Sequence, residues 1–103
     1  MCQVLLLITT ESNEKKAKDI AKLLLKKKLA ACVSLKHIYS IYKWGNDIEE
    51  SKEFEITIKS KPELKDDLIV FLKKMTSYEI PQIIYKKFYS EKKYNDWLIK
   101  AFN

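Results

Sequence analysis

The hydrophobic positions of the chain change period several times, and each change marks a new element. Residues 4–8 form an unbroken apolar run with the length of a strand buried on both faces. Polar residues 9–13 are expected to end this strand, with Ser12 as N-cap and Glu14 in the first turn of a helix. That helix is expected to run to Lys28 with a lysine-rich outer face. Its apolar residues recur at helical spacing: Ala17, Ile20, Ala21 and Leu24.

Two extended segments joined by a turn follow this helix. Residues 31–44 contain no helix breaker and are rich in β-branched and aromatic side chains, which predicts one long strand. Gly45 and Asn46 tolerate positive φ and predict a turn over residues 44–47. Residues 48–59 alternate with period two and therefore complete a hairpin. One face of this strand carries Phe54, Ile56 and Ile58, and the other carries Glu53, Glu55, Thr57 and Lys59.

The C-terminal half predicts a helix, a strand and a short last helix. Residues 60–63 match a capping box with Pro62 in the first turn. The helix that follows has an apolar stripe of Leu64, Leu68, Phe71, Leu72 and Met75. Residues 80–88 predict a fourth strand, with Pro81 near its start, where a missing N–H is tolerated. The last helix is indicated by Tyr94, Trp97, Leu98 and Phe102. The element order is therefore βαββαβ with a terminal helix, an α+β, ferredoxin-like sandwich in a single domain over residues 1–103.

The long strand does not suit a lone copy of this fold. Residues 31–44 would span about 46 Å at ~3.3 Å per residue. The helix before it, of about sixteen residues, covers only about 24 Å. The hairpin must therefore extend beyond its helices, and its end carries Tyr39, Ile41, Tyr42 and Trp44. We expect a partner subunit to cover these side chains and to pair with the exposed strand edges.

Composition excludes several classes of site. The chain has 103 residues, a formal net charge of +6, one glycine, one histidine and two cysteines. One glycine cannot supply a Gly-rich phosphate loop, and one histidine with two cysteines cannot form a four-ligand zinc site in one chain. Cys2 and Cys32 do not make a disulfide framework, and residues 4–8 are too short for a signal peptide or a membrane span. We therefore expect a cytoplasmic protein with reduced thiols.

The basic charge does not predict a nucleic-acid partner. All twenty basic residues are lysine, and lysine lacks the bidentate fork and the stacking plane that arginine offers to bases. Residues 53–56 also lack the stacking motif that an RNA-binding ferredoxin-like domain carries in its third strand. The lysine bias is more typical of genome composition than of selection for a partner.

Few residues suggest chemistry, and no nucleophile–base pair is present. His37 and Cys32 are expected to be structural residues of the long strand, and Cys2 to be exposed near the terminus. The return strand carries a cluster of acids, Glu49, Glu50, Glu53 and Glu55. They form either a solvated sheet face or a cation or ligand site completed across a subunit boundary. Tyr78 and Glu79 precede Pro81 at a loop–strand junction, which favours either a binding residue pair or a simple tight turn.

Several segments together resemble a known family. They are residues 29–33, 40–44, 48–49, 53, 59, 78–84, 94 and 97–98. In order and spacing they resemble the CutA family of divalent-cation-tolerance proteins, essentially from end to end. The resemblance implies a ferredoxin-like homotrimer with extended intersubunit sheets, cytosolic in bacteria, linked to copper tolerance and able to bind divalent metal. It implies no enzymatic activity, and the fold is also similar to that of PII-type signalling proteins.

The chain departs from the family pattern at positions that concern metal. The family usually has His-Pro-Tyr-Glu or His-Ser-Tyr-Glu before the fourth strand, and Thr76 stands at the histidine position here. Some members have a cysteine in the first strand, and this chain has Ile8 at the matching position. The remaining oxygen ligands favour hard cations over copper. The family's turn glycine aligns with Asn46 and its lysine with Asp47, and asparagine is expected to keep the turn.

We therefore expect a ligand or metal cleft where residues of one subunit approach the hairpin of a neighbour. Its candidate residues are Glu79, Tyr78, Lys59, Trp44, Tyr42 and Glu53. Glu79 would supply a carboxylate, Lys59 would orient it or a ligand anion, and the aromatic residues would wall the cleft. The expected function is homotrimeric divalent-cation tolerance, with a divalent cation such as Cu²⁺ as the one cofactor considered. The alternatives are a PII-like sensor of a small anionic metabolite and a structural trimer that holds an unidentified protein partner.

Overall fold

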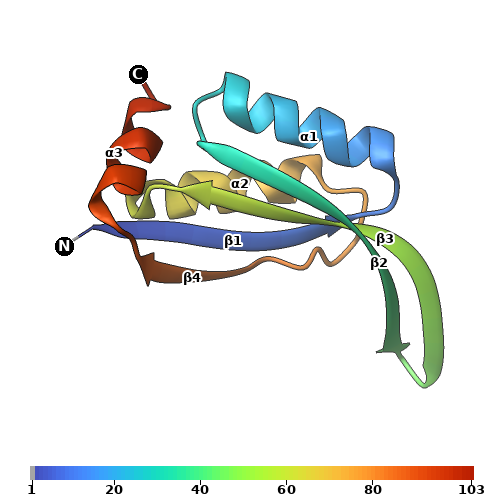
Figure 1. Cartoon of the computed structure of the whole chain (residues 1–103). Coiled ribbons are helices and arrows are strands. Elements are labelled where there is room, and N and C mark those ends of the chain that lie inside the picture. Colours follow the sequence, from blue (N-terminus) through green and yellow to red (C-terminus); the bar gives the residue numbers. More distant parts are fainter. Residues whose placement is uncertain (1) are drawn as a thin grey trace.

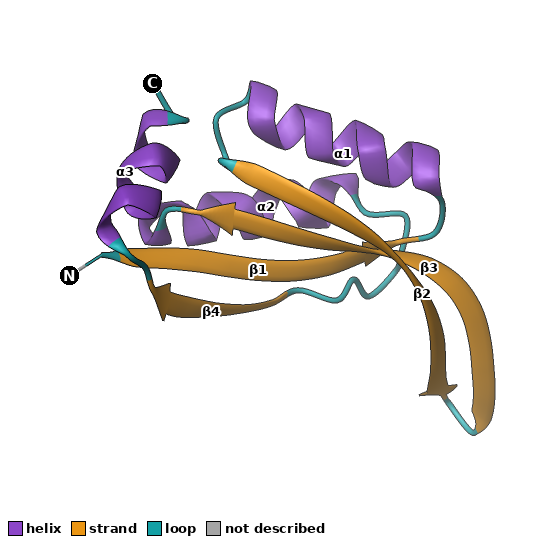
Figure 2. Ribbon diagram, viewed as in Figure 1, coloured by secondary structure: helices purple, strands orange, loops and turns teal. Residues whose placement is uncertain are grey.

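The computed structural model describes residues 2–103 as a four-stranded antiparallel sheet with two helices packed against one face (Figures 1 and 2). The first half contains β1 (Gln3–Glu11), α1 (Glu14–Lys26), β2 (Cys32–Trp44) and β3 (Asp47–Ser60). The second half contains a 3-10 turn (Pro62–Leu64), α2 (Lys65–Met75), β4 (Ile84–Tyr89) and α3 (Lys92–Lys100). The strand order is β2-β3-β1-β4. The ferredoxin-like fold expected from the sequence is confirmed.

The core lies between the sheet and the helices α1 and α2. Alternate residues of the two central strands point toward the helices, and the i, i+3, i+4 positions of both helices point back. The buried residues of this cluster are Leu5, Leu7, Ala17, Ile20, Leu24, Ala30, Ile56, Ile58, Leu68 and Leu72. Within residues 2–103, no helix lies against the opposite face of the sheet (Figure 2).

The β2–β3 hairpin extends well beyond the helices, as the arithmetic on the sequence predicts. Its strands pair from Cys32 opposite Lys59 to Trp44 opposite Asp47, and the molecule measures 46 × 24 × 23 Å. In Figure 1 the distal part of the hairpin curves away from the helix-covered part. Gly45 takes the left-handed conformation in the turn, with φ +64°, while Asn46 does not have positive φ. The turn therefore survives because the chain's only glycine supplies the strained position.

Three boundaries around the first helix differ from the sequence prediction. β1 continues to Glu11 instead of stopping at residue 8, because Thr9 and Thr10 are β-branched and pair with β3. The N-cap of α1 is Asn13, whose Oδ1 accepts a hydrogen bond of 2.8 Å from the N–H of Lys16. The helix ends at Lys26, because Lys28 has φ 59° and cannot continue a right-handed helix.

Two boundaries in the second half also differ. Ser60 is not a helix cap. It ends β3, and its hydroxyl donates a hydrogen bond of 2.6 Å to the carbonyl of Leu29. β4 begins at Ile84, paired with Ile8, whereas the sequence predicted a start at residue 80. Pro81 has no N–H to donate to a ladder, and the chain before Ile84 forms an irregular link from α2. The predicted terminal helix is confirmed, with Leu98 buried.

Candidate functional site

A cleft of about 670 Å³ lies between the hairpin and the link that joins α2 to β4. One wall comes from the distal half of β2 and β3, and the other from residues 78–82. The lining residues are Thr10, Ser40, Ile41, Tyr42, Lys43, Trp44, Glu49, Glu53, Tyr78, Glu79, Ile80 and Gln82. The cleft thus depends on the part of the hairpin that extends beyond the helices, where β3 no longer pairs with β1.

Strand periodicity explains most of the hairpin side chains in the cleft lining, with Ile41 and Lys43 as the exceptions on the alternate face of β2. Ser40, Tyr42 and Trp44 alternate along β2 and therefore share one face. Glu49 is directly opposite Tyr42 in the ladder, and Glu53 follows at an even spacing on the same face of β3. Two aromatic and two acidic side chains of the cleft are thus presented by one regular hairpin.

A hydrogen bond closes the inner end of the cleft. The phenol of Tyr78 donates to Oε2 of Glu53 at 2.6 Å, which joins residues 25 positions apart. Burial raises the pKa of Tyr78 well above its ordinary value, and the hydrogen bond to the Glu53 carboxylate raises it further. Tyr78 is therefore a neutral donor at physiological pH. Its hydrogen bond holds the Glu53 carboxylate in place through Oε2 and does not involve Oε1.

Two backbone N–H groups of the turn at Tyr78 are bound by side-chain oxygens. The N–H of Tyr78 donates to Oγ1 of Thr76 at 3.0 Å. The N–H of Ser77 donates to Oε2 of Glu11, also at 3.0 Å. Sequence reasoning missed Glu11, although it continues the inward-facing series of alternate residues Leu5, Leu7 and Thr9 along β1. That alternation, carried two residues beyond Thr9, would have indicated a buried acid.

Five of the six candidate residues meet in this cleft within one chain: Tyr42, Trp44, Glu53, Tyr78 and Glu79. The contribution of a neighbouring hairpin stays a prediction, and Lys59 is not in the group. It lines a separate hollow of about 330 Å³ with Val4, Leu6, Phe88 and Tyr94 among others. Glu53 and Lys59 share a strand face, but six residues of strand separate them by about 20 Å.

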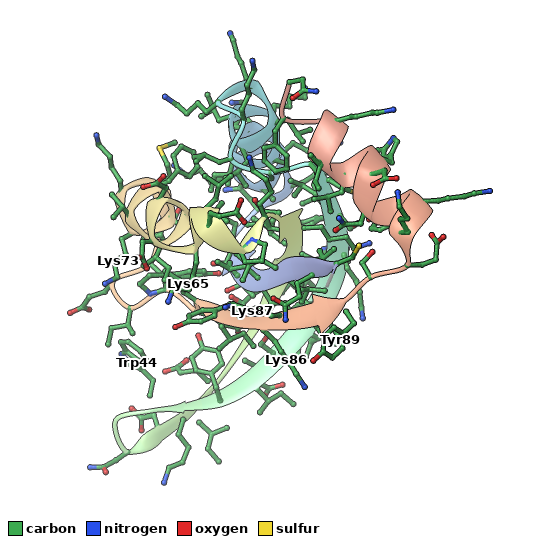
Figure 3. All side chains as sticks on the ribbon, turned by 90° about the vertical axis from the view of Figure 1, so that its left-hand side faces the viewer. Trp44, Lys65, Lys73, Lys86, Lys87 and Tyr89 are labelled. Carbon is green, nitrogen blue, oxygen red and sulfur yellow. The ribbon has the colours of Figure 1, made fainter. Side chains whose placement is uncertain are left out.

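The other residues considered from the sequence lie outside the cleft. The His37 ring stacks on Phe54 with centroids 4.3 Å apart, which confirms a structural position for this histidine. Cys2 and Cys32 are free thiols and both are half-buried, so Cys2 is less exposed than expected. Figure 3 shows Trp44 on the hairpin and four labelled lysines, Lys65, Lys73, Lys86 and Lys87, on α2 and β4. None of these four lysines lines the cleft.

The donor set decides which metal the cleft suits. Within residues 2–103, no three or more His, Cys, Asp or Glu side chains cluster closely enough to hold a metal ion. The cleft contains no histidine and no cysteine, so it does not fit copper. Its charged residues are Glu49, Glu53 and Glu79, with Lys43 as the one lysine. Carboxylate oxygens of this kind are donors that hard cations prefer.

A family model described as CutA1 divalent ion tolerance protein matches residues 5–101. The chain belongs to the CutA1 family. The match includes β1 from Leu5 onward, every later element through α3 and all residues that line the cleft. The resemblance seen in the sequence is thereby confirmed.

Individual CutA relatives support this assignment. The divalent-cation tolerance protein CutA of Archaeoglobus fulgidus is 42% identical over 76 residues, covering 74% of each chain. Protein CutA of Mus musculus is 42% identical over 73 residues, which are 70% of this chain and 41% of the mouse protein. The match thus spans less than half the length of this mammalian relative. The archaeal name describes tolerance of divalent cations and states no catalysed reaction.

Solved CutA structures share the fold. The structure of CutA from Synechococcus elongatus PCC7942 superposes with a TM-score of 0.94 at 31% identity, covering 100% of this chain and 93% of that one. The Archaeoglobus fulgidus structure, described as a periplasmic divalent cation tolerance protein, gives 0.92 at 32% identity and covers 97% and 99%. No helix within residues 2–103 is both long and apolar enough to cross a membrane.

Proposed function

We propose that this CutA1-family chain acts in divalent-cation tolerance by binding a hard divalent cation in the cleft, without catalysis. The observation that carries the proposal is the charge of the lining, which contains three glutamates and one lysine. Carboxylate oxygens are the ligands that Mg²⁺, Ca²⁺ and Mn²⁺ prefer. The family description and the archaeal relatives' names, which refer to divalent ions, support the same class of ligand.

The donor geometry favours a cation that is only partly dehydrated. Glu53 gives one oxygen to Tyr78, and Glu79 is exposed on the opposite wall. Fewer than three acids converge within the described chain, so water would complete the coordination, as is usual for Mg²⁺. Copper is disfavoured as the cargo, because neither imidazole nor thiol lines the cleft.

The proposal includes a homotrimer in the cytoplasm. Exposed apolar side chains on the hairpin, such as Ile41 at 65% and Ile48 at 72%, favour burial by other copies of the chain. A second hairpin beside the cleft would add ligands to those that one chain provides. Both cysteines are free thiols, which favours a reducing compartment.

A small organic ligand is the second candidate, because Tyr42, Trp44 and Ile80 give the cleft an apolar wall. The acidic lining disfavours the anionic metabolite considered from the sequence. A neutral or cationic compound would suit this wall better. A compound that raises the melting temperature without metal would favour this candidate.

Titration with Mn²⁺ tests cation binding. Free Mn²⁺ would be counted by electron paramagnetic resonance, and Trp44 fluorescence would report the cleft in a Trp97→Phe background. We expect saturable binding that Mg²⁺ displaces, and about tenfold weaker binding in Glu79→Gln, since a charge-assisted contact contributes ~1.5 kcal/mol.

The matched control is Glu63→Gln, which removes an exposed acid from the 3-10 turn, outside the cleft. This variant should bind Mn²⁺ as the unchanged chain does. Equal affinity of the Glu79→Gln and Glu63→Gln variants would contradict the proposed site, and absence of saturable Mn²⁺ or Mg²⁺ binding would contradict the proposed function.

A further inference from the structure

A fully buried carboxylate lies behind the cleft and is not part of its lining. Glu11 is the last residue of β1, and only 1% of its surface is exposed. It pairs with Phe54 of β3, and its side chain points to the helix-covered face, as those of Leu5 and Leu7 do. An ionised group in this position loses its hydration and needs compensation.

The compensation comes from two backbone donors. Oε2 accepts the hydrogen bond of 3.0 Å from Ser77, and Oε1 accepts one of 3.3 Å from Ser12. The ion pairs found among residues 2–103 involve Lys15, Lys18, Lys65 and Lys92, and none of them reaches Glu11. A buried acid held only by backbone amides is a poor source of stability compared with an apolar side chain of similar size. What it provides is a fixed contact to Ser77, 66 positions away in the chain.

That contact lies one residue from the cleft. Ser77 precedes Tyr78, whose phenol is bound to Glu53 on the other face of the sheet. In Figure 1 the link from α2 to β4 passes the end of β1, where the hairpin begins to extend alone. The turn is therefore held by one carboxylate on each side of the sheet, Glu11 through the backbone and Glu53 through the side chain.

We propose that Glu11 is a positioning residue: its buried carboxylate holds the backbone of the turn at Ser77, so that Tyr78 and Glu79 face the hairpin. The inference rests on the proposed function, because the side chains that it positions are those assigned to the cation. Glu11 itself does not touch the cleft.

Two substitutions separate positioning from simple stabilisation. Glu11→Gln keeps the shape but weakens the acceptor, and Glu11→Leu removes both acceptors and the buried charge. Neither change requires a new cavity, so the leucine variant should unfold at the same or a higher denaturant concentration. We expect the amides of Ser77 and Tyr78 to exchange with solvent about ten- to a hundredfold faster in Glu11→Leu, because a hydrogen bond to a charged group is lost. The increase should be smaller in Glu11→Gln, whose amide oxygen still accepts a weaker hydrogen bond. Glu14→Gln, which removes an exposed acid at the start of α1, is the matched control.

Amide exchange by NMR would be measured together with Mn²⁺ titration. Faster exchange confined to residues 77–79, with weaker Mn²⁺ binding and unchanged global stability, would support the proposal. Unchanged exchange at Ser77, or an increase spread evenly over β1 and α2, would overturn it. Local release of the turn with unaltered Mn²⁺ affinity would also overturn it. If the unchanged chain bound no Mn²⁺, the proposed function would fail, while the exchange data would still decide whether Glu11 holds the turn.

Discussion

The hydrogen bond between Tyr78 and Glu53 links stability to alkaline pH. Burial and then the Glu53 carboxylate raise the pKa of Tyr78 above the ordinary value of about 10. The folded state therefore holds the phenolic proton more tightly than the unfolded state does. The contribution of the protonated Tyr78 to the free energy of unfolding is complete below pH ~10 and is lost as the pH rises toward the folded-state pKa. We expect Tyr78→Phe to lower the free energy of unfolding by about 1 kcal/mol at neutral pH. Above pH ~10, the free energy of unfolding of this variant should fall less steeply with pH than that of the unchanged chain. Urea denaturation across this range would measure both effects.

Tyr85→Phe provides the control for this prediction. Tyr85 is an exposed tyrosine of β4 and its ring lies under the Lys65 ammonium, a contact that phenylalanine retains. Its stability should follow that of the unchanged chain at every pH. Identical curves for the two variants would show that Tyr78 is not coupled to Glu53 in the way described.

Residue-level prediction used local chemistry and strand parity, and neither gives the distance along an element. Tyr78 and Glu79 were singled out because they precede Pro81 at a junction, and both line the cleft of the single chain. Lys59 lines a separate hollow of that chain, because parity fixes the face of a strand but not the position along it, and its place beside a neighbouring hairpin stays a prediction. Glu11 was missed because the polar residues Thr9 and Thr10 before it suggested the end of the strand, although all three are buried.

At the scale of elements, the end of α1 stores strain that the sequence does not reveal. Lys28 has φ 59°, a left-handed conformation that costs an L residue about 1 kcal/mol. Lys28→Gly would remove that cost, and the extra freedom of glycine in the unfolded chain would offset part of the gain. We therefore expect a net increase of about 0.5 kcal/mol in the free energy of unfolding, measured by urea denaturation at one protein concentration.

Lys27→Gly is the comparison that isolates backbone conformation. Lys27 has φ −83° and ψ 1°, so glycine gives no relief there and should destabilise by about 0.5–1 kcal/mol. The two neighbouring substitutions remove the same charge and should act with opposite sign. Equal destabilisation by both would contradict the strain assigned to Lys28.

Periodicity predicted every helix and strand, but not their ends. The long hairpin was predictable because residues 31–44 contain no breaker and are rich in β-branched and aromatic side chains, while residues 48–59 alternate with period two. The starts of α1 and β4 were displaced, since Asn13 outcompetes Ser12 as a cap and the link from α2 must cross the end of β1 before Ile84 can pair. Such boundaries depend on tertiary neighbours, which a local pattern does not contain.

At the scale of the whole molecule, the hairpin is the element whose apolar side chains a single copy of the chain leaves exposed. It carries the hairpin wall of the cleft, yet its distal strands have neither helices nor β1 beside them. Tyr39, Ile41 and Ile48 are all more than half exposed there. A surface of this kind is typical of an interface between copies. The same assembly would bring a second hairpin near each cleft, so oligomerisation and cation binding should be linked.

The mass in solution tests this arrangement. We expect light scattering to give three times the 12.2 kDa chain mass at micromolar concentration. Ile48→Lys should shift the mass toward the monomer and weaken Mn²⁺ binding, because a buried unpaired ammonium at a hairpin interface costs several kcal/mol and Ile48 does not itself line the cleft. Val70→Lys is the matched control, since Val70 is a similarly exposed apolar residue, 67% against 72%, but lies on α2. That variant should keep the mass and the affinity. A monomer mass for the unchanged chain would contradict the proposed trimer, and equal dissociation by both variants would show that the hairpin is not its interface.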